Sequence, residues 1–260
     1  MAIQEFYYGT SWHWPVEIVP RVMLSYNYIR TLKHPWVIEK PWMLDSGAFS
    51  VISKYGKYPW DVKEYAKAIE KWHPTVAWTM DYPCEPSVRG KGGYTCRESQ
   101  ILTNENTIKL TESGVQVSSV VQGWTVEDYL SNLDMIKEAG LLTERLGIGT
   151  LCRRNMTDEI VKIIKAVHNN VPGWVKLHGF GVKITILKTE ARFLLYSADS
   201  AAWSYNVRRY SLLESGHKIN GKQITPYLLD FISKMESYLG QDEPFERFST
   251  FDTVTEGIQK

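Results

Sequence analysis

Short runs of apolar and β-branched residues recur along the chain, and segments with the period of an amphipathic helix separate them. The runs predict strands at residues 5–8, 42–44, 75–80, 115–121, 146–151, 174–177 and 193–196, with an eighth near 207–213. The helical period is carried by residues 61–72, 125–139, 157–167 and 227–239. The chain therefore alternates strand with helix over most of its length.

Strands separated by single helices indicate right-handed crossovers and a parallel sheet. We expect an α/β fold of the (β/α)8 TIM-barrel type. Polar residues follow strand after strand, whereas an open doubly wound sheet would gather its site at one switch point. No linker, repeat or low-complexity tract divides the sequence. We therefore predict one barrel domain over residues 1–240 and a polar C-terminal extension over residues 241–260.

Composition and charge narrow the class of protein. Hydrophobic residues make up 43% of the chain and charged residues 23%, as in an ordinary globular protein. The net charge is +1, so nucleic acid would be held only by locally clustered cations. Cys84, Cys96 and Cys152 lack the spacing of a disulfide framework or a paired zinc motif, which favours free thiols in a reducing cytoplasm. With no signal peptide or membrane-spanning run visible, we expect a soluble, cytoplasmic protein.

Three aspartates stand at the carboxyl ends of predicted strands. Asp45 ends the run PWMLD, Asp81 follows TVAWTM, and Asp199 follows RFLLYSA. Loops at the carboxyl ends of barrel strands meet in one mouth, and a buried carboxylate is costly unless it is paired or hydrogen-bonded. We therefore expect the three carboxylates to share a polar cleft, and we interpret the chain as an enzyme.

Other predicted strands also end in polar or small residues. In chain order these are Gln122, Gly123, Gly149, Thr150, His178 and Gly179. Carboxylates, an amide and accessible backbone groups suit a planar polar heterocycle such as a purine, because together they offer donors and acceptors along one edge of the ring. Phe49, two residues after Gly47, is placed to stack on such a ring.

Five segments in this order resemble motifs of the tRNA-guanine transglycosylase superfamily. They are DSGAFS at 45–50, VVQGW at 120–124, GIGTLCRR at 147–154, HGFG at 178–181 and SADSAAW at 197–203. The corresponding family motifs are D-S-G-G-[FY]-Q, Q-G-G, a Gly-Gly-Leu-rich loop, M-G-V-G and the segment that holds the nucleophilic aspartate. The resemblance covers most of the chain. It implies a TIM barrel that exchanges guanine for a 7-deazaguanine in a polynucleotide.

The chain also departs from the members that act on tRNA. It has no cysteine after Cys152, so it lacks the C-x-C-x-x-C…H zinc site that they carry after the nucleophile. Ser50 replaces the glutamine of the first motif, and Trp124 replaces the second glycine of Q-G-G. In these respects the chain resembles the zinc-free DpdA-type branch of phages and genomic islands, which acts on DNA. We therefore expect DNA and a free 7-deazaguanine, such as 7-cyano-7-deazaguanine, as partners, with neither metal nor cofactor.

The resemblance implies a role for each site residue. Asp199 would be the nucleophile that forms a covalent sugar–enzyme intermediate, and Asp45 would be the general acid and base. Asp81 and Gln122 would read the Watson–Crick side of the base, on which Phe49 would stack. The remaining contacts to the base would come from Ser46, Gly123, Gly149, Thr150, Leu151 and Gly179, with His178 as a wall of the pocket.

Two clusters of cations are expected at the rim of the same mouth. Arg89 and Lys91 lie in the glycine-rich loop VRGKGGYT, and Arg153 and Arg154 follow the strand at 146–151. Phosphates beside an extruded nucleotide would run past both clusters. An ordinary solvated loop explains either cluster equally well.

Several alternatives stay open at this point. Asp45 and Asp199 would also suit caps, Asp81 a turn before Tyr-Pro, and Gln122 a partner for backbone; His178 and Phe49 would also suit the core. The rival functions are a transglycosylase acting on tRNA, a TIM-barrel nucleosidase or glycoside hydrolase, and an inactive base-binding subunit of a larger assembly. The sequence leaves the oligomeric state open, whether homo- or hetero-oligomer.

Overall fold

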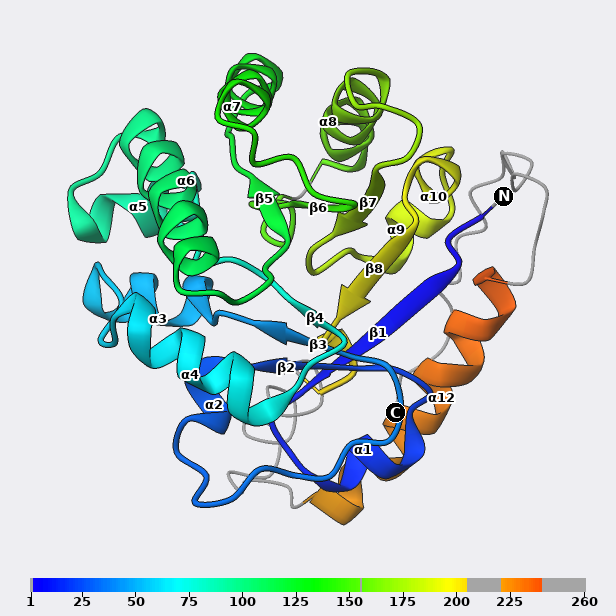
Figure 1. The fold of residues 1–260 in the computed structure, drawn as a ribbon. Coiled ribbons are helices and arrows are strands. Elements are labelled where there is room, and N and C mark those ends of the chain that lie inside the picture. Colours follow the sequence, from blue (N-terminus) through cyan, green and yellow to red (C-terminus); the bar gives the residue numbers. More distant parts are fainter. Residues whose placement is uncertain (1, 155, 205–220, 240–260) are drawn as a thin grey trace, which may run out of the picture.

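Eight parallel strands form a single curled sheet at the centre of the computed structural model (Figure 1). The strands are β1 (Glu5–Thr10), β2 (Val22–Ser25), β3 (Trp42–Asp45), β4 (Val76–Ala77), β5 (Ser119–Val121), β6 (Arg145–Ile148), β7 (Lys176–Gly179) and β8 (Ser197–Ser200). Neighbours follow the order β4-β3-β2-β1-β8-β7-β6-β5, and a parallel bridge between Trp78 and Ser118 joins the two outer strands. The fold is therefore the expected (β/α)8 type. The structure describes residues 2–154, 156–204 and 221–239.

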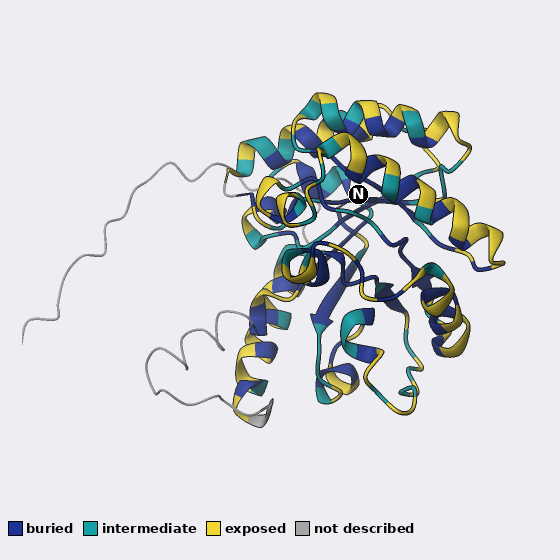
Figure 2. Cartoon of the chain, turned by 90° about the vertical axis from the view of Figure 1, so that its left-hand side faces the viewer, coloured by how far each residue is buried: buried dark blue, intermediate teal, exposed yellow. Residues whose placement is uncertain are grey.

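Helices surround the sheet and turn their exposed faces outward (Figures 1 and 2). They are α1 (Trp14–Ile18), α2 (Tyr26–Ile29), α3 (Ala48–Tyr55), α4 (Val62–Trp72), α5 (Pro86–Gly92), α6 (Cys96–Glu112), α7 (Val126–Glu138), α8 (Thr157–Asn169), α9 (Ile184–Leu187), α10 (Ala191–Leu194) and α12 (Gly221–Leu239). None of the helices in the described part of the chain combines the length and apolar character that a bilayer crossing requires.

Capping residues fix where the long helices begin. Thr95 and Thr125 each accept a hydrogen bond from the N–H three residues later, and the acidic side chain at that position accepts one from the backbone N–H of the cap residue in α6 and α7. Asp61 caps α4 in the same way through the N–H of Glu64, at 2.8 Å. The helices predicted at 61–72 and 125–139 therefore start where the sequence indicates.

The core has two layers, because successive strand residues point to opposite faces of the sheet. Phe6 and Tyr8 of β1 belong to the large outer layer, between the strands and the helices. Tyr7 points the other way, into a smaller cluster inside the barrel that also contains Met23, Met43, Val76, Trp78 and Val120. Side chains thus fill the interior of the barrel, which is a packed core and not a pore.

Some predicted strands differ from the observed ones. Strand β2 was not predicted, because Val22–Ser25 is a four-residue run whose period does not separate strand from helix. The run predicted as a strand at 193–196 is partly the helix α10, and β8 begins just after it, at Ser197. The predicted strand near 207–213 and the polar extension at 241–260 lie outside the described residues.

Two further expectations need correction. Cys84 and Cys96 form a disulfide, whereas free thiols were predicted; they flank α5 with their Cα atoms 4.8 Å apart, within the range that a disulfide spans. Cys152 is free. The predicted loop that carries Arg89 and Lys91 is largely the helix α5, which begins with Pro86, ends at Gly92 and is followed by a left-handed Gly93.

Candidate active site

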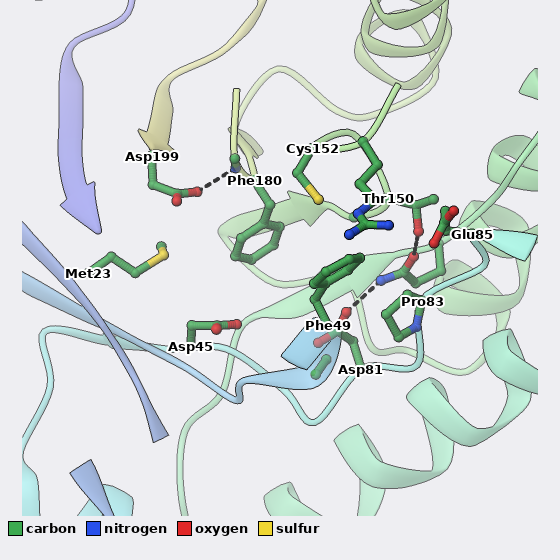
Figure 3. A pocket seen from close by; sticks show the side chains of 15 residues that line it. Met23, Asp45, Phe49, Asp81, Pro83, Glu85, Thr150, Cys152, Phe180 and Asp199 are labelled. Atoms are coloured by element: carbon green, nitrogen blue, oxygen red, sulfur yellow. Dashed lines mark hydrogen bonds between the residues drawn. The ribbon is translucent and has the colours of Figure 1, made fainter. Parts of the chain in front are cut away.

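A pocket opens at the carboxyl-terminal end of the barrel and contains all three strand-end aspartates (Figure 3). The empty space within the pocket and at its open mouth amounts to about 810 Å³. The lining residues are Met23, Asp45, Ala48, Phe49, Asp81, Pro83, Glu85, Gln122, Gly149, Thr150, Cys152, Arg153, Phe180, Gly181 and Asp199. Residues more than 150 positions apart in the sequence thus meet around one cavity.

Asp45 is the last residue of β3 and faces the pocket. Gly47 follows with a φ of +81°, and its N–H donates to Asp45 Oδ2 over 3.0 Å. A Cβ at Gly47 would lie 2.7 Å from Ser25 Oγ, so this turn requires glycine for both its conformation and its space. Burial, reinforced by the charges of Asp81 and Asp199, raises the pKa of Asp45 to about 8. This carboxyl group therefore holds a proton at neutral pH.

Asp81 lies just after β4 and is held by side chains from both sides of the pocket. Its Oδ1 accepts from Ser46 Oγ over 3.1 Å, and its Oδ2 accepts from Gln122 Nε2 over 2.6 Å. Tyr58 OH donates to the Asp81 carbonyl over 2.8 Å and lies 2.8 Å from Ser46 Oγ. Burial raises the pKa of Asp81 to about 6, against the opposing effect of these hydrogen bonds. Asp81 is therefore a fixed acceptor on the pocket wall.

Gln122 continues this chain of hydrogen bonds to the next strand. Thr150 Oγ1 donates to Gln122 Oε1 over 2.6 Å and accepts from the N–H of Cys84 over 3.1 Å. Thr150 has a φ of +58°, which a β-branched residue rarely adopts, so its side-chain hydrogen bonds hold a strained backbone. Gly149 leaves the space that the amide needs, because a Cβ there would lie 2.2 Å from Gln122 Nε2. The orientation of the Gln122 amide is thus set by its neighbours.

Asp199 projects from β8 on the opposite side of the cavity from Asp81 (Figure 3). It is 8% exposed, and its Oδ1 accepts from the N–H of Gly181 over 2.8 Å. His178 Nε2 lies 3.3 Å from the same oxygen. Among the described residues, no hydrogen bond is made to Asp199 Oδ2. The two oxygens of Asp199 therefore differ: one is held by backbone, and the other accepts no hydrogen bond from the described residues.

Phe49 and Arg153 form the outer wall of the pocket. The Arg153 guanidinium lies 4.8 Å from the centroid of the Phe49 ring, and the side chain is exposed. Arg154 does not face the rim: it is 3% exposed, its guanidinium lies against Trp124 at 4.3 Å, and it pairs with Glu159. Of the two adjacent arginines, only Arg153 is open to a polynucleotide.

The other predicted contact residues lie behind the pocket wall or away from it. Ser46 is fully buried and reaches the pocket only through Asp81. Leu151 is core, while Gly123 and Gly179 pack so closely against Tyr129 and Val182 that a Cβ would clash. His178 is fully buried beneath Asp199. Arg89 donates to the Tyr94 carbonyl over 3.1 Å and Lys91 is exposed on α5; neither lines the cavity.

Several lining residues were not predicted. They are Met23, Ala48, Pro83, Glu85, Cys152, Phe180 and Gly181. Met23 belongs to the cluster inside the barrel and Phe180 packs against it, so the two form the floor of the pocket. Phe180, Gly181 and Cys152 lie within segments already singled out by the motifs, which is a signal that could have found them. Met23 lies on the unpredicted β2, which offered no such signal.

The arrangement provides two separate chemical functions. One cavity holds Asp45, a carboxyl group that keeps its proton at neutral pH, and Asp199, whose Oδ2 accepts no hydrogen bond from the described residues; a proton donor and a carboxylate nucleophile are the two functions that such a pair can supply. Asp81, Gln122 and Thr150 present a line of donors and acceptors to a polar ring. Within residues 2–154, 156–204 and 221–239, no three His, Cys, Asp or Glu side chains are grouped to hold a metal ion.

A comparison with protein families identifies the family of the chain. The model of the family described as DpdA, DeoxyPurine in DNA protein A, matches residues 4–236. No curated protein matches the chain. The family match includes every described strand and all residues that line the pocket. It implies a DNA substrate and supports a transglycosylase-like role, and the chain thus belongs to the DpdA family.

Proposed function

We propose that this protein replaces guanine in DNA with a free 7-deazaguanine, through a covalent intermediate between Asp199 and the deoxyribose. The observation that carries the proposal is that one cavity contains both residues: Asp45 is protonated, and Asp199 Oδ2 has no hydrogen bond among the described residues. Base exchange needs both an acid for the departing base and a nucleophile for the sugar carbon.

The first half of the reaction removes guanine. Asp199 Oδ2 attacks C1′ of the deoxyribose, and the bond between C1′ and N9 breaks with its electron pair moving to the base. The Asp45 proton passes to the guanine, which leaves as a neutral molecule. The products are an ester between Asp199 and the sugar, a free base and an Asp45 carboxylate.

The second half reverses these steps with a different base. N9 of the incoming 7-deazaguanine attacks C1′, its proton passes to Asp45, and the electron pair of the ester bond returns to Asp199. Two displacements at one carbon retain the configuration of the sugar. The reaction consumes no oxidant, reductant or cofactor, because every proton and electron pair is returned.

The pocket wall supplies groups that suit a guanine-like ring. The Asp81 carboxylate accepts from adjacent N–H groups of the base, and the Gln122 amide has one N–H hydrogen left beyond its bond to Asp81. Phe49 offers a flat face, with the Arg153 guanidinium beside it. The target nucleotide has to leave the stack to enter such a pocket, at a cost of about a few kcal/mol in a duplex.

The experiment is base exchange measured by mass spectrometry. The protein is incubated with 7-cyano-7-deazaguanine and with either duplex DNA or tRNA, and the nucleic acid is digested to nucleosides. A parallel reaction with isotope-labelled guanine tests the bond exchange itself, whichever deazaguanine is the natural substrate. Asp199→Asn is the inactive variant, and Asp158→Asn, at an exposed position of α8, is the matched control.

The outcomes separate the candidate functions. Label in DNA that disappears in Asp199→Asn and persists in Asp158→Asn supports the proposal. Incorporation into tRNA alone would overturn the DNA substrate while keeping the mechanism. Release of guanine without incorporation of a new base would identify a hydrolase, and no reaction with either polymer would contradict an enzyme that acts alone.

A further inference from the structure

Beneath the pocket, His178 lies between a serine and the proposed nucleophile. Its Nδ1 lies 2.9 Å from Ser197 Oγ, and its Nε2 lies 3.3 Å from Asp199 Oδ1. His178 and Ser197 are fully buried, and Asp199 is 8% exposed. The ring is packed between Trp78 and Phe180, with ring centroids 4.9 Å and 4.7 Å away. Its position is therefore fixed by packing, and His178 does not line the cavity.

We infer that His178 is a positioning residue that turns Asp199 so that Oδ2, and not Oδ1, attacks the sugar, and that Ser197 sets the tautomer of the ring. The inference rests on the proposed function for its reaction and on the contacts of His178 for its geometry. It assigns His178 a role different from the wall of the base pocket that the sequence suggested.

The charge state of the ring supports this assignment. Burial lowers the pKa of His178, against the opposing effect of Asp199, so the imidazole is neutral and carries one N–H. A serine hydroxyl that donates to Nδ1 leaves that proton on Nε2, which faces the carboxylate. Nε2 makes no hydrogen bond of normal geometry among the described residues, so its N–H is unused there, and Asp199 Oδ1, 3.3 Å away, can receive it after a small rotation.

The two groups beside Oδ1 act in the same direction. The Gly181 N–H donates to Oδ1 from the loop after β7, and the His178 ring approaches Oδ1 from β7 itself. With Oδ1 bonded to the Gly181 N–H and the His178 ring 3.3 Å away on another side, rotation of the carboxylate is restricted and Oδ2 stays toward the cavity. A nucleophile held in its attacking orientation does not lose rate to unproductive rotamers.

The test combines one spectroscopic and one kinetic measurement. In the resting protein, nitrogen-15 NMR of the histidine side chains reports the tautomer, and the His178 signals are those missing from His178→Gln. We expect Nε2–H. The kinetic measurement is rapid-quench formation of the covalent protein–DNA adduct in wild type, His178→Met, His178→Gln and Ser197→Ala, with binding of 7-cyano-7-deazaguanine and thermal stability measured alongside.

Methionine fills a similar space without an N–H, while glutamine keeps a donor near the Nε2 position. We expect His178→Met to slow adduct formation by about tenfold to a hundredfold, the size of one hydrogen bond to a charged group, with binding of the base unchanged. His178→Gln should recover most of the rate, and Ser197→Ala should lose a smaller part of it.

Three results would overturn the inference: an Nδ1–H tautomer, a wild-type rate in His178→Met, or equal losses in the methionine and glutamine variants. Failure of the proposed function looks different. In that case the wild type itself forms no adduct, and the tautomer measured in the resting protein still decides the arrangement of Ser197, His178 and Asp199.

Discussion

Carboxylates at the two ends of the barrel have opposite surroundings. At the amino-terminal end, Glu5 Oε2 pairs with Arg145 Nη1 at 2.9 Å and accepts from Tyr7 OH at 3.0 Å, with both charged side chains 17% exposed. Burial acts to raise the pKa of Glu5, but the hydrogen bond and charge of Arg145 outweigh it and lower this pKa. At the carboxyl-terminal end, among the described residues, Asp45, Asp81 and Asp199 pair with no lysine or arginine.

The difference shows how one fold separates stability from reactivity. Glu5 and Arg145 satisfy each other, so the ionised state of Glu5 favours folding. Asp45 is buried beside two other carboxylates, and ionising it works against folding. Barrel enzymes place chemistry at the carboxyl-terminal face and stabilising contacts at the other face, and the surroundings of these carboxylates fit that division.

The largest expected effect comes from removing the acid at the reactive end. Asp45→Asn should lower base exchange by about 10²- to 10⁴-fold, because it removes the group proposed to protonate the departing guanine. In the wild type, the rate of guanine release should also fall as the pH rises through about 8, where Asp45 loses its proton. Single-turnover release of guanine, measured between pH 6 and pH 10, checks both expectations.

The same variant should be the more stable protein at high pH. The folded pKa of Asp45 is raised to about 8 from an ordinary 3.8, so the unfolded chain loses this proton first and the wild type loses stability between those values. Asp45→Asn lacks that loss. Denaturation of the two proteins at pH 4 and pH 9 should give similar stabilities at pH 4 and a clear advantage for Asp45→Asn at pH 9. Equal stabilities of the two proteins at both pH values would mean that the pKa of Asp45 is not raised in the folded protein.

The next effect belongs to the stable end. Arg145→Met should lower the free energy of unfolding by about 2 kcal/mol, because it leaves the partly buried Glu5 without its partner. Base exchange per folded molecule should stay unchanged. Urea denaturation of Arg145→Met, Glu5→Gln and the double variant gives the coupling energy of the pair. A loss of exchange in the folded variant would show that the two ends are not independent.

Thr150 tests whether the hydrogen-bond chain in the pocket reads the base. Thr150→Val keeps the shape of the side chain but removes both the donor to Gln122 and the acceptor for the Cys84 N–H. We expect the KM for the incoming base to rise about tenfold, which corresponds to one or two hydrogen bonds, with little change in kcat. Thr150→Ser retains the hydroxyl and is the control. Equal KM values in the two variants would show that the Thr150 hydroxyl does not contribute to base recognition.

The smallest effect is expected at the rim. Arg153→Ala should weaken DNA binding by a few-fold and reduce the dependence of log Kd on log salt by about one phosphate contact. Lys162→Ala, an exposed cation on α8, is the control. Binding of a fluorescent DNA duplex across a salt series measures both slopes. An unchanged slope in Arg153→Ala would mean that Arg153 does not contact a phosphate of the DNA.

The sequence predicted the general architecture because strand-like apolar runs and segments with a helical period can be recognised even when each is short. It also identified Asp45, Asp81 and Asp199, because strand ends in a barrel converge whatever the lengths of the connecting loops. It did not identify β2, since four apolar residues carry too little periodicity to distinguish a strand from a helix. Long periodic segments, strand ends and most of the short strands were therefore predictable, whereas β2 was not.

Side-chain direction was the other limit. Arg153 and Arg154 are adjacent in sequence, yet one is exposed at the pocket and the other is buried. Their directions depend on the backbone of the loop after β6, where Thr150 has a positive φ. His178 posed the same difficulty: its place on β7 points it inward, but only the neighbouring Trp78 and Phe180 fix its depth below the pocket.

The barrel closes at the junction between its outer strands β4 and β5, which we call the seam. The described backbone hydrogen bonds across it run from Thr79 N to Ser118 O at 3.0 Å and from Ser118 N to Ala77 O at 2.8 Å. The side-chain bond from Gln122 to Asp81 crosses the same seam inside the pocket. A base that binds both residues would join the first four strands to the last four. Ligand binding at this site would then slow amide hydrogen exchange more at Thr79 and Ser118 than in distant strands, because the ligand and the closed seam stabilise each other.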